Sequence, residues 1–354
     1  MARDWILYGA SGVTGAQIAE VAVRRRHRPL LVGRAASRLA PLAERLGLEW
    51  AVADIADEAA LAVLVGSAPL TLLAASPFTV TGPPLLRACL AAGVHYLDIA
   101  NEPGVFETVY GHDQQARRRG AALLLGAGFG VTATDPLARH VADALADADR
   151  LDLTYCLYTA GTSPGAHANA LSALASGGQV RRTGRLVPVG LGASVRRAER
   201  PGGDATVFAA PLGDLAAAYR TAGIADITVE TAIAAPSWLA RLALPVLPVV
   251  ARSRALQRRA ARATGKTLPL RDPSRRTYVR ARASAVDGRS AEAWLATGKG
   301  YAFTAEASVR AVESVLAGPA AGSHSPGGLL GADFPLDIPG TRRFGPPATI
   351  DGRG

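Results

Sequence analysis

The sequence predicts an α/β fold in two domains: a first domain with a doubly wound parallel sheet, and a second α+β domain with a mixed or antiparallel sheet. The chain has 354 residues, more than one hydrophobic core usually supports, so two domains are expected. Short apolar runs alternate with segments of helical periodicity over residues 5–126. Residues 278–286 and 290–297 alternate in polarity around an Asp-Gly pair, which is typical of an antiparallel hairpin.

Six apolar runs of four to six residues mark the strands of the first domain. Near-continuous apolar strands are typical of a parallel sheet that is buried on both faces. The segments between the runs repeat apolar residues at helical spacing, as Ile18, Val21 and Ala22 do after the first run. This alternation predicts helices on both faces of the sheet. The runs are residues 5–8, 29–33, 50–53, 70–75, 94–99 and 121–126.

The segment GASGVTG, residues 9–15, lies between the first apolar run and the first helical pattern. A dinucleotide-binding (Rossmann) glycine loop occupies this position, although its commoner spacing is G-x-G-x-x-G. Gly9 allows a tight turn, Gly12 a close approach of the backbone to a pyrophosphate, and Gly15 the packing of helix on strand. We therefore predict cofactor contacts by Gly9, Ser11, Gly12, Val13, Thr14 and Gly15.

The end of the second apolar run predicts which dinucleotide binds. An NAD site places Asp or Glu near this point for the ribose 2′-hydroxyl, whereas an NADP site offers arginine to the 2′-phosphate. Arg34 follows the run, Arg38 lies one helical turn further on, and no carboxylate is near. Guanidinium groups suit a phosphate dianion, so NADPH is the predicted cofactor. Asp54, after the third run, is placed to meet the edge of the adenine ring.

Three further motifs resemble those of the saccharopine dehydrogenase-like oxidoreductases, a family that includes the trans-acting enoyl reductases. They are SPFTVTG at residues 76–82, HYLDIANE at 95–102 and GAGFGVTATDPLA at 126–138. In that family the first motif usually reads G-P-F-x-x-x-G and runs beside the nicotinamide. In the second motif, Asn101 stands where glycine is commoner. The resemblance implies cofactor contacts by Ala75, Ser76, Pro77 and Phe78.

The second half of the chain resembles the same family more loosely. Residues 210–234 follow a family segment in which Leu212 replaces the usual tryptophan, and residues 278–318 follow its strand, turn, strand and helix. The layout predicts an NADP-binding domain of residues 1–137 that is completed by 303–354. Residues 138–302 are then expected to form a substrate and dimerisation domain, and the resemblance implies a homodimer.

Several classes of protein are disfavoured by what the sequence lacks. No tyrosine has a lysine four residues later, and no H-E-x-x-H, G-x-S-x-G or P-loop motif is present. Cys89 and Cys156 lie apart from each other and have no metal-ligand spacing, so no metal site is expected. The net charge of +10 comes from scattered arginines without interleaved aromatic residues, which argues against nucleic-acid binding.

Hydride transfer by a nicotinamide is the chemistry that remains. Reduction of a C=C or C=N bond also needs a proton from a side chain within hydrogen-bond reach. The predicted catalytic candidates are Tyr96, Asp98, Tyr158 and His167, and Glu102, Lys299 and Tyr301 lie near the same predicted crevice.

The substrate is predicted to be lipophilic. The second domain is rich in Ala and Leu, and residues 236–251 are mostly apolar, whereas a tricarboxylate amino acid would need several cationic anchors. We therefore expect an enoyl reductase that acts on an acyl or polyketide-type chain. An acidic acyl carrier protein would suit the net charge of +10 as the carrier of that chain. An imine reductase, a saccharopine-type amino-acid dehydrogenase and a non-catalytic NADP-binding partner remain the alternatives.

Residues 236–253 also raise the question of a membrane segment. Arg241, Pro245 and Pro248 interrupt this stretch, and it is shorter than the roughly 20 apolar residues that a spanning helix needs. We therefore expect a kinked segment that lines a pocket or a subunit contact, and no membrane span. Because the first strand begins near the start of the given sequence, no signal peptide is expected and the predicted location is the cytoplasm.

Overall fold

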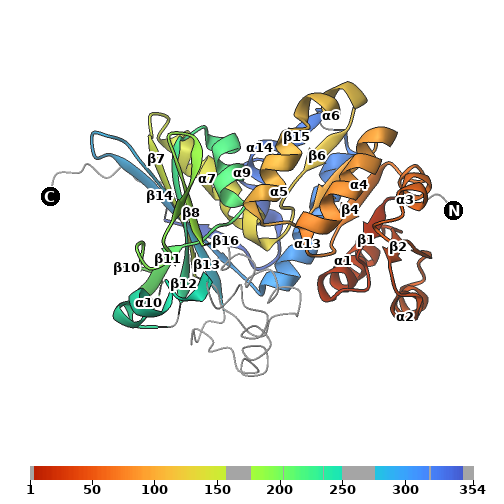
Figure 1. Ribbon diagram of the computed structural model, residues 1–354, viewed down its shortest axis with the longest axis horizontal. Coiled ribbons are helices and arrows are strands. Elements are labelled where there is room, and N and C mark those ends of the chain that lie inside the picture. The colour runs from red at the N-terminus through yellow and green to blue at the C-terminus, as the bar shows by residue number, and fades with distance from the viewer. Residues whose placement is uncertain are drawn as a thin grey trace. The chain divides into compact units, whose positions relative to one another are not determined.

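The chain forms two compact units, and each is described here by itself. Unit 1 comprises Met1–Thr132 and Gly300–Gly331, and unit 2 comprises Ala133–Lys299 and Ala332–Gly354. The ribbon in Figure 1 follows the chain from its N-terminus in unit 1 to its C-terminus in unit 2. The computed structural model describes residues 4–156, 177–201, 203–233, 235–248, 276–318 and 320–345.

Unit 1 is built on a seven-stranded sheet of order β15-β6-β5-β4-β1-β2-β3, and all of its strand pairs are parallel. The strand order reverses at β1, which pairs with β2 on one side and β4 on the other. The predicted doubly wound sheet is therefore confirmed. Its strands are β1 (Ile6–Tyr8), β2 (Leu30–Gly33), β3 (Trp50–Val52), β4 (Leu70–Leu73), β5 (His95–Asp98), β6 (Ala122–Leu124) and β15 (Gly322–His324).

Helices cover this sheet because each carries one apolar side. In α1, for example, Ile18, Ala19 and Ala22 have no exposed surface. α1 packs against α13, and α4 packs against α3 and α5; Figure 1 shows α4 and α5 on the viewer's side of the sheet. The helices are α1 (Val13–Arg24), α2 (Ala36–Leu46), α3 (Glu58–Val65), α4 (Phe78–Ala92), α5 (Pro103–Tyr110), α6 (Asp113–Arg119), α13 (Gly300–Leu316) and α14 (Pro326–Leu330); α7 (Phe129–Ala144) continues into unit 2.

Unit 2 contains the predicted second sheet, and this sheet is mixed. Its main path has the order β10-β11-β12-β7-β13-β14-β16, and β8 and β9 form a hairpin beside β12. The β12–β7 pair is parallel and the other pairs are antiparallel. The strands are β7 (Arg150–Cys156), β8 (Gly178–Arg182), β9 (Arg185–Val189), β10 (Arg196–Ala198), β11 (Ala205–Ala209), β12 (Asp226–Ile233), β13 (Thr277–Ser284), β14 (Ser290–Thr297) and β16 (Arg342–Phe344), with helices α9 (Asp214–Ala222) and α10 (Ser237–Ala243) and a 3-10 helix (Phe334–Asp337).

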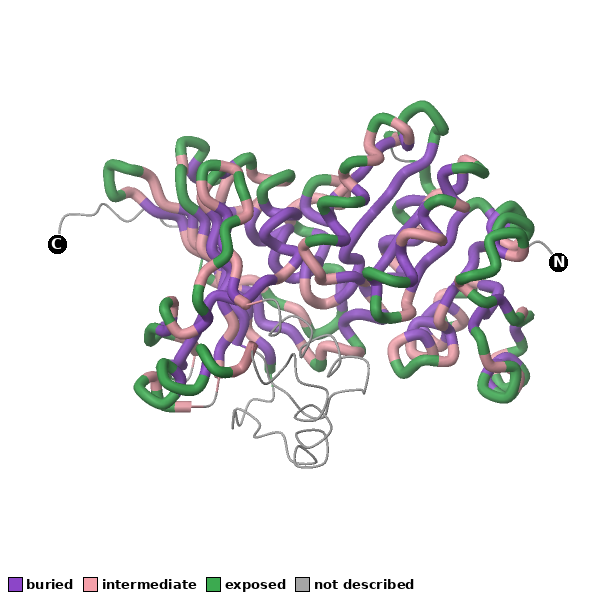
Figure 2. The backbone as a smooth tube through the Cα atoms, in the orientation of Figure 1, coloured by how far each residue is buried: buried purple, intermediate pink, exposed green. Residues whose placement is uncertain are grey.

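One segment lies in a different unit from the one that the sequence suggested. We expected residues 303–354 to complete the first domain, but residues from Ala332 onward group with unit 2. The physical reason is β16, whose backbone pairs with β14 and places Phe344 opposite Trp294, where the two rings stack. Figure 2 shows that the buried backbone follows the strands of both sheets while the loops remain exposed.

Candidate functional site

The carboxyl ends of the parallel strands bring the predicted site segments to one edge of the unit 1 sheet. β1 ends at Tyr8, β2 at Gly33, β4 at Leu73 and β5 at Asp98. The segments that follow these strands include the glycine loop, Arg34, residues 75–78 and Glu102. Ligands of doubly wound sheets bind at this edge, beside the point where the strand order reverses. In this chain that point is the gap between the loops after β1 and β4.

The glycine loop has the backbone geometry that a dinucleotide needs. Gly9 has φ +93°, and a Cβ there would lie 2.8 Å from the Ala74 carbonyl carbon at the end of β4. A Cβ on Gly15 would overlap the Gly9 carbonyl oxygen and lie 2.8 Å from the Cα of Ala10. Helix α1 therefore packs directly on the loop, and larger residues do not fit at either glycine. Ser11 and Thr14 are half-buried beside exposed Gly12 and Val13.

The first turn of α1 fits a pyrophosphate. Its N-cap, Gly12, provides no side-chain hydrogen bond to the first helical amides, and the turn holds no acidic residue. Val13 is 51% exposed, so the start of the helix is accessible. The first N–H groups of a helix lack intrahelical acceptors and carry a partial positive charge, which favours an anion. A bound nicotinamide dinucleotide would supply the hydride, and this loop would hold its phosphates.

Arg34 and Arg38 are both exposed, directly after β2 and in the first turn of α2. Arg34 and Asp54 both act electrostatically on the hydroxyl of Tyr8. Burial raises the pKa of Tyr8 to about 12, the Asp54 carboxylate adds to the rise, and the Arg34 guanidinium opposes it. The ends of β1, β2 and β3 therefore bring a cation and a carboxylate within electrostatic range of one hydroxyl. These are the groups that would meet an adenosine 2′-phosphate and an adenine edge.

Two residues that the sequence did not single out hold this edge in shape. The Tyr8 hydroxyl donates to the Ala53 carbonyl oxygen at 3.0 Å and so ties the end of β1 to the end of β3. The Thr81 hydroxyl contacts the carbonyl oxygens of Ala75 and Pro77 at 2.5 and 3.1 Å, which fixes the segment after β4. In that segment Ser76 and Pro77 are exposed, the peptide bond between them is cis, and Phe78 is buried. The sequence signals that these roles leave are small: Thr81 is a polar residue one turn into α4, and Tyr8 is a hydroxyl-bearing residue at the end of β1.

Tyr96 and Asp98 lie inside the domain, with no exposed surface. The Tyr96 hydroxyl donates to Asp98 Oδ2 at 3.0 Å, and the backbone amides of Ala100 and Gly126 donate to Oδ1 at 3.1 and 3.0 Å. Burial raises the pKa of Asp98 to about 6, although these hydrogen bonds oppose the rise. Burial also raises the pKa of Tyr96 well above its ordinary value. The pair joins the end of β5 to the loop after β6, which is the geometry of positioning residues.

The other predicted catalytic residues are placed differently. Tyr158 and His167 lie outside the described residues. Lys299 is exposed, and Tyr301 is half-buried in α13. Glu102 is half-buried at the N-terminus of α5, where its Oε2 accepts a hydrogen bond from the Asn101 amide at 2.9 Å. Burial raises the pKa of Glu102 and the Asp98 carboxylate adds to the rise, so Glu102 is an accessible carboxyl group that retains a proton more readily than usual.

An apolar groove of about 210 Å³ lies between the first turns of α4 and α5 in unit 1. Both helices begin at the carboxyl edge of the sheet, so the groove starts beside the segment that follows β4. Gly104 in its wall has open space where a Cβ would stand. Sequence periodicity did not reveal this groove because its lining comes from two helices that β5 separates along the chain. Its lining residues are Phe78, Thr79, Gly82, Pro83, Leu86, Gly104, Val105, Thr108 and Val109.

Among the described residues, no group of three or more His, Cys, Asp or Glu side chains is placed to hold a metal ion. Both cysteines are buried and free. Burial raises the pKa of Cys89 to about 12 and that of Cys156 to about 11. Neither thiol is therefore suited to act as a nucleophile.

These features define an NADP-binding Rossmann domain. More particularly, residues 5–124 match the family described as the saccharopine dehydrogenase NADP-binding domain. The predicted resemblance and the predicted cofactor, NADP(H), are thereby confirmed, and this domain is of the kind that oxidoreductases carry.

Similar proteins agree with this assignment. The trans-acting enoyl reductase of Mycobacterium leprae is 32% identical over 140 residues, covering 37% of this chain and 34% of the relative. The saccharopine dehydrogenase-like oxidoreductase of Bos taurus is 26% identical over 144 residues, covering 35% and 34%. These alignments span about a third of each relative's length. The fold matches apo saccharopine dehydrogenase (L-Glu forming) from Saccharomyces cerevisiae with a TM-score of 0.64 and 12% identity, over 97% of this chain and 100% of that one.

Proposed function

We propose that this protein is an NADPH-dependent reductase that transfers hydride to the C=C bond of a lipophilic acyl or polyketide-type chain. The observation that carries the proposal is the edge of the unit 1 sheet, where a glycine loop for a pyrophosphate, two exposed arginines and an apolar groove occur together. The groove suits a hydrocarbon chain, because its lining residues include no charged side chain. The name of the mycobacterial relatives, trans-acting enoyl reductase, supports reduction of C=C.

The partner that we propose is an acyl carrier protein that presents this chain. Carrier proteins of this kind are acidic, and the net charge of +10 favours encounter with an acidic surface. We further propose that residues 138–302 contribute to substrate binding and to a homodimer. An imine substrate is the competing hypothesis, because C=N reduction uses the same hydride and needs the same kind of proton donor.

Glu102 is the proton donor that we propose. A general acid must reach the substrate and keep its proton near neutral pH. Among the candidates within the described residues, Tyr96 and Asp98 have no exposed surface, whereas Glu102 is partly exposed and has a raised pKa. Glu102→Gln should lower kcat by roughly 100-fold or more, in line with the usual contribution of acid catalysis, and leave the Kd for NADPH unchanged.

The decisive experiment follows NADPH consumption with α,β-unsaturated acyl thioesters of increasing chain length, beside a panel of imines. We expect turnover of the thioesters, with a KM that falls as the chain grows. Gly104→Leu should fill the groove and raise the KM for long chains but not for short ones, and Gly104→Ala is the matched control. Turnover of imines alone would replace the enoyl proposal, and NADPH binding without turnover of either panel would remove the proposed activity altogether.

A further inference from the structure

Helix α10 and the turn after it, residues 237–247, are apolar on two sides. The inner side packs in unit 2, where Ala240 and Leu244 are 2% and 4% exposed and lie in one cluster with Leu191, Val195 and Phe208. A helix that only covers a core is expected to be polar on its outer side. The outer side of α10 does not follow this rule.

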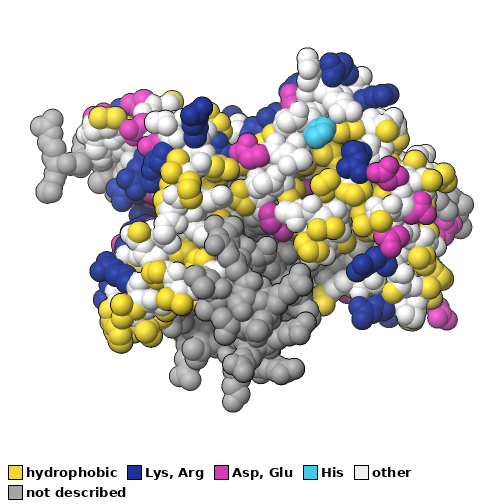
Figure 3. Space-filling view, in the orientation of Figure 1, with side chains coloured by type: hydrophobic (Ala, Val, Ile, Leu, Met, Phe, Trp, Pro, Cys, Tyr) yellow, Lys and Arg dark blue, Asp and Glu magenta, His cyan; other side chains and the backbone are white. Residues whose placement is uncertain are grey.

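The outer side carries four large hydrophobic side chains. Trp238 is 66% exposed, Leu239 43%, Leu242 68% and Val246 54%. Within α10, Trp238 and Leu242 are spaced four residues apart and so share one side of the helix, and Val246 follows in the turn after it. Single exposed hydrophobic residues are normal on a protein surface, whereas a contiguous group indicates an interaction site. Figure 3 shows hydrophobic side chains gathered at the lower left of the molecule, where Figure 1 places α10, with basic side chains directly beside them.

The charge around α10 is positive. Arg241 lies within the helix, and its guanidinium group donates to the Val195 carbonyl oxygen at 3.2 Å. Arg197 lines the same surface hollow as Trp238 and is 70% exposed, with Asp204 as its partner at 3.1 Å. The sequence that follows the helix is basic as well, and residues 231–271 contain no Asp or Glu. Their basic residues are Arg241, Arg252, Arg254, Arg258, Arg259, Arg262, Lys266 and Arg271.

Exposed Trp and Leu together with arginine are typical of segments that lie in the headgroup layer of an anionic membrane. A second copy of the chain fits less well, because a two-fold interface brings the same patch of each copy together and so opposes equal charges. The hollow beside Trp238 is not lined by Leu239, Leu242 or Val246, so most of the apolar side lies outside it, where the side chains can insert between lipid headgroups. No helix among the described residues is long and apolar enough to cross a bilayer, so the contact would be peripheral.

We infer that residues 237–247 dock this protein on the surface of a membrane that contains anionic lipids, with Trp238 and Leu242 inserted and Arg197 and Arg241 at the headgroups. The inference does not depend on the proposed reductase activity. It assigns to unit 2 a surface that is separate from the NADP-binding edge of unit 1.

The test is flotation of the full-length protein with vesicles of phosphatidylcholine alone or mixed with phosphatidylglycerol. The protein should float with the mixed vesicles, remain behind with phosphatidylcholine, and dissociate as salt is raised. Leu242→Asp should weaken binding roughly tenfold or more, because a charge replaces an inserted side chain. Val286→Asp is the matched control: Val286 is 89% exposed in the same unit, in the turn between β13 and β14, and its replacement should leave binding unchanged.

Trp238→Phe supplies a second readout. It should keep most of the binding and lose the blue shift in tryptophan fluorescence that the mixed vesicles cause. NADPH affinity should be the same in all variants, which separates loss of docking from misfolding. Flotation that is absent, or that is unaffected by Leu242→Asp, would overturn the inference. If Leu242→Asp instead abolished only a dimer in solution or only the turnover of carrier-bound substrate, α10 would be a protein contact and the membrane assignment would be wrong.

Discussion

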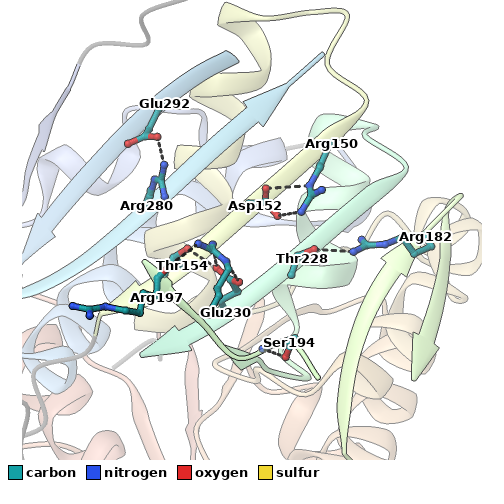
Figure 4. Close-up of polar contacts among 12 residues, drawn as sticks. Arg150, Asp152, Thr154, Arg182, Ser194, Arg197, Thr228, Glu230, Arg280 and Glu292 are labelled. Atoms are coloured by element: carbon teal, nitrogen blue, oxygen red, sulfur yellow. Dashed lines mark hydrogen bonds and ion pairs between the residues drawn. The ribbon is translucent and has the colours of Figure 1, made fainter. Parts of the chain in front are cut away.

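The two sheets carry their polar groups in different places. Every residue of β1, β2 and β4 is buried, so the parallel sheet of unit 1 presents chemistry only where its strands end. In unit 2 the residues of β13 alternate between buried and half-buried positions, and Figure 4 shows ion pairs and hydrogen bonds across one face of β7, β12, β13 and β14. Arg280 and Glu292 form one such pair, and Arg182 donates to Thr228 at 3.1 Å.

This difference follows from how each sheet is covered. Helices on both faces of a parallel sheet exclude water from the faces, so a ligand can only reach the loops at the strand ends. A mixed sheet with one apolar face leaves the other face to polar side chains, which must then satisfy one another. We therefore expect substitutions at the edge of the first sheet to change cofactor binding, and substitutions on the polar face of the second sheet to change stability.

The largest effect is expected at Gly15, where the edge of the first sheet is built. In Gly15→Val the side chain meets the backbone of Gly9 and Ala10, and α1 must move away from the loop. Overpacking of this kind costs about 3 kcal/mol or more when backbone atoms must shift. Urea denaturation and NADPH titration should show loss of both stability and affinity. Gly12→Ala is the control, because a Cβ there would lie 3.3 Å from the Gly9 oxygen, a much smaller conflict than at Gly15, and the free energy of unfolding should change far less.

The second effect concerns Asp98, the buried carboxyl group behind the same edge. Its folded-state pKa is about 6, above the ordinary value of 3.8. A raised pKa means that the neutral acid is favoured by folding, so its stabilisation is fully present below the unfolded pKa and is lost as pH rises through 6. The difference between the two pKa values corresponds to a total change of about 3 kcal/mol in the free energy of unfolding.

Asp98→Asn tests this assignment, because the amide cannot ionise and its oxygen can still accept from Ala100 and Gly126. Between pH 4 and 7, the free energy of unfolding of the wild type should fall relative to that of the variant by about 2.4 kcal/mol, because part of the full change lies below pH 4. Urea denaturation at a series of pH values measures this gap. Parallel curves for the two proteins would show that the carboxyl group is not responsible.

How much was predictable from the sequence differs between the same two regions. The apolar run at residues 5–8 contains β1, because a doubly buried strand is visible as uninterrupted hydrophobicity. The pairing of β16 with β14 was not predictable, because it joins segments almost fifty residues apart through backbone bonds that leave no periodic signal. Asp98 was found as a polar residue at a strand end, but its burial depends on Gly126 in a distant loop. The position of a residue along a strand can be predicted from the local sequence, whereas its burial and its hydrogen-bond partners cannot.

On the polar face of the second sheet, substitution of Glu230 should lower stability and leave NADPH affinity unchanged, whereas substitution of Gly15 should lower both. Its side chain is 4% exposed and accepts from Arg196 Nε at 2.7 Å and from the Thr154 hydroxyl at 3.2 Å. Glu230→Gln leaves Arg196 without its buried counter-charge, but Arg196 is 44% exposed and can be solvated. We therefore expect the free energy of unfolding to fall by about 2 kcal/mol. Asp204→Asn, in an exposed pair, should cost below about 0.5 kcal/mol. A change in NADPH affinity in either variant would contradict the division between edge and face.

The smallest change in the free energy of unfolding is expected at Arg34. The effect of this substitution on cofactor binding is nevertheless the most specific to the edge of the first sheet. Arg34 is exposed, so its removal should hardly alter unfolding. A charged hydrogen bond to the 2′-phosphate contributes about 1.5 to 3 kcal/mol. Arg34→Ala should therefore raise the KM for NADPH roughly 10- to 100-fold and that for NADH only slightly, because NADH lacks this phosphate. Arg45→Ala, which removes an exposed partner of Glu20 from the last turn of α2, should change neither constant. Equal increases for both cofactors would mean that Arg34 shapes the loop instead of binding the phosphate, and the preference for NADPH would then have to come from Arg38.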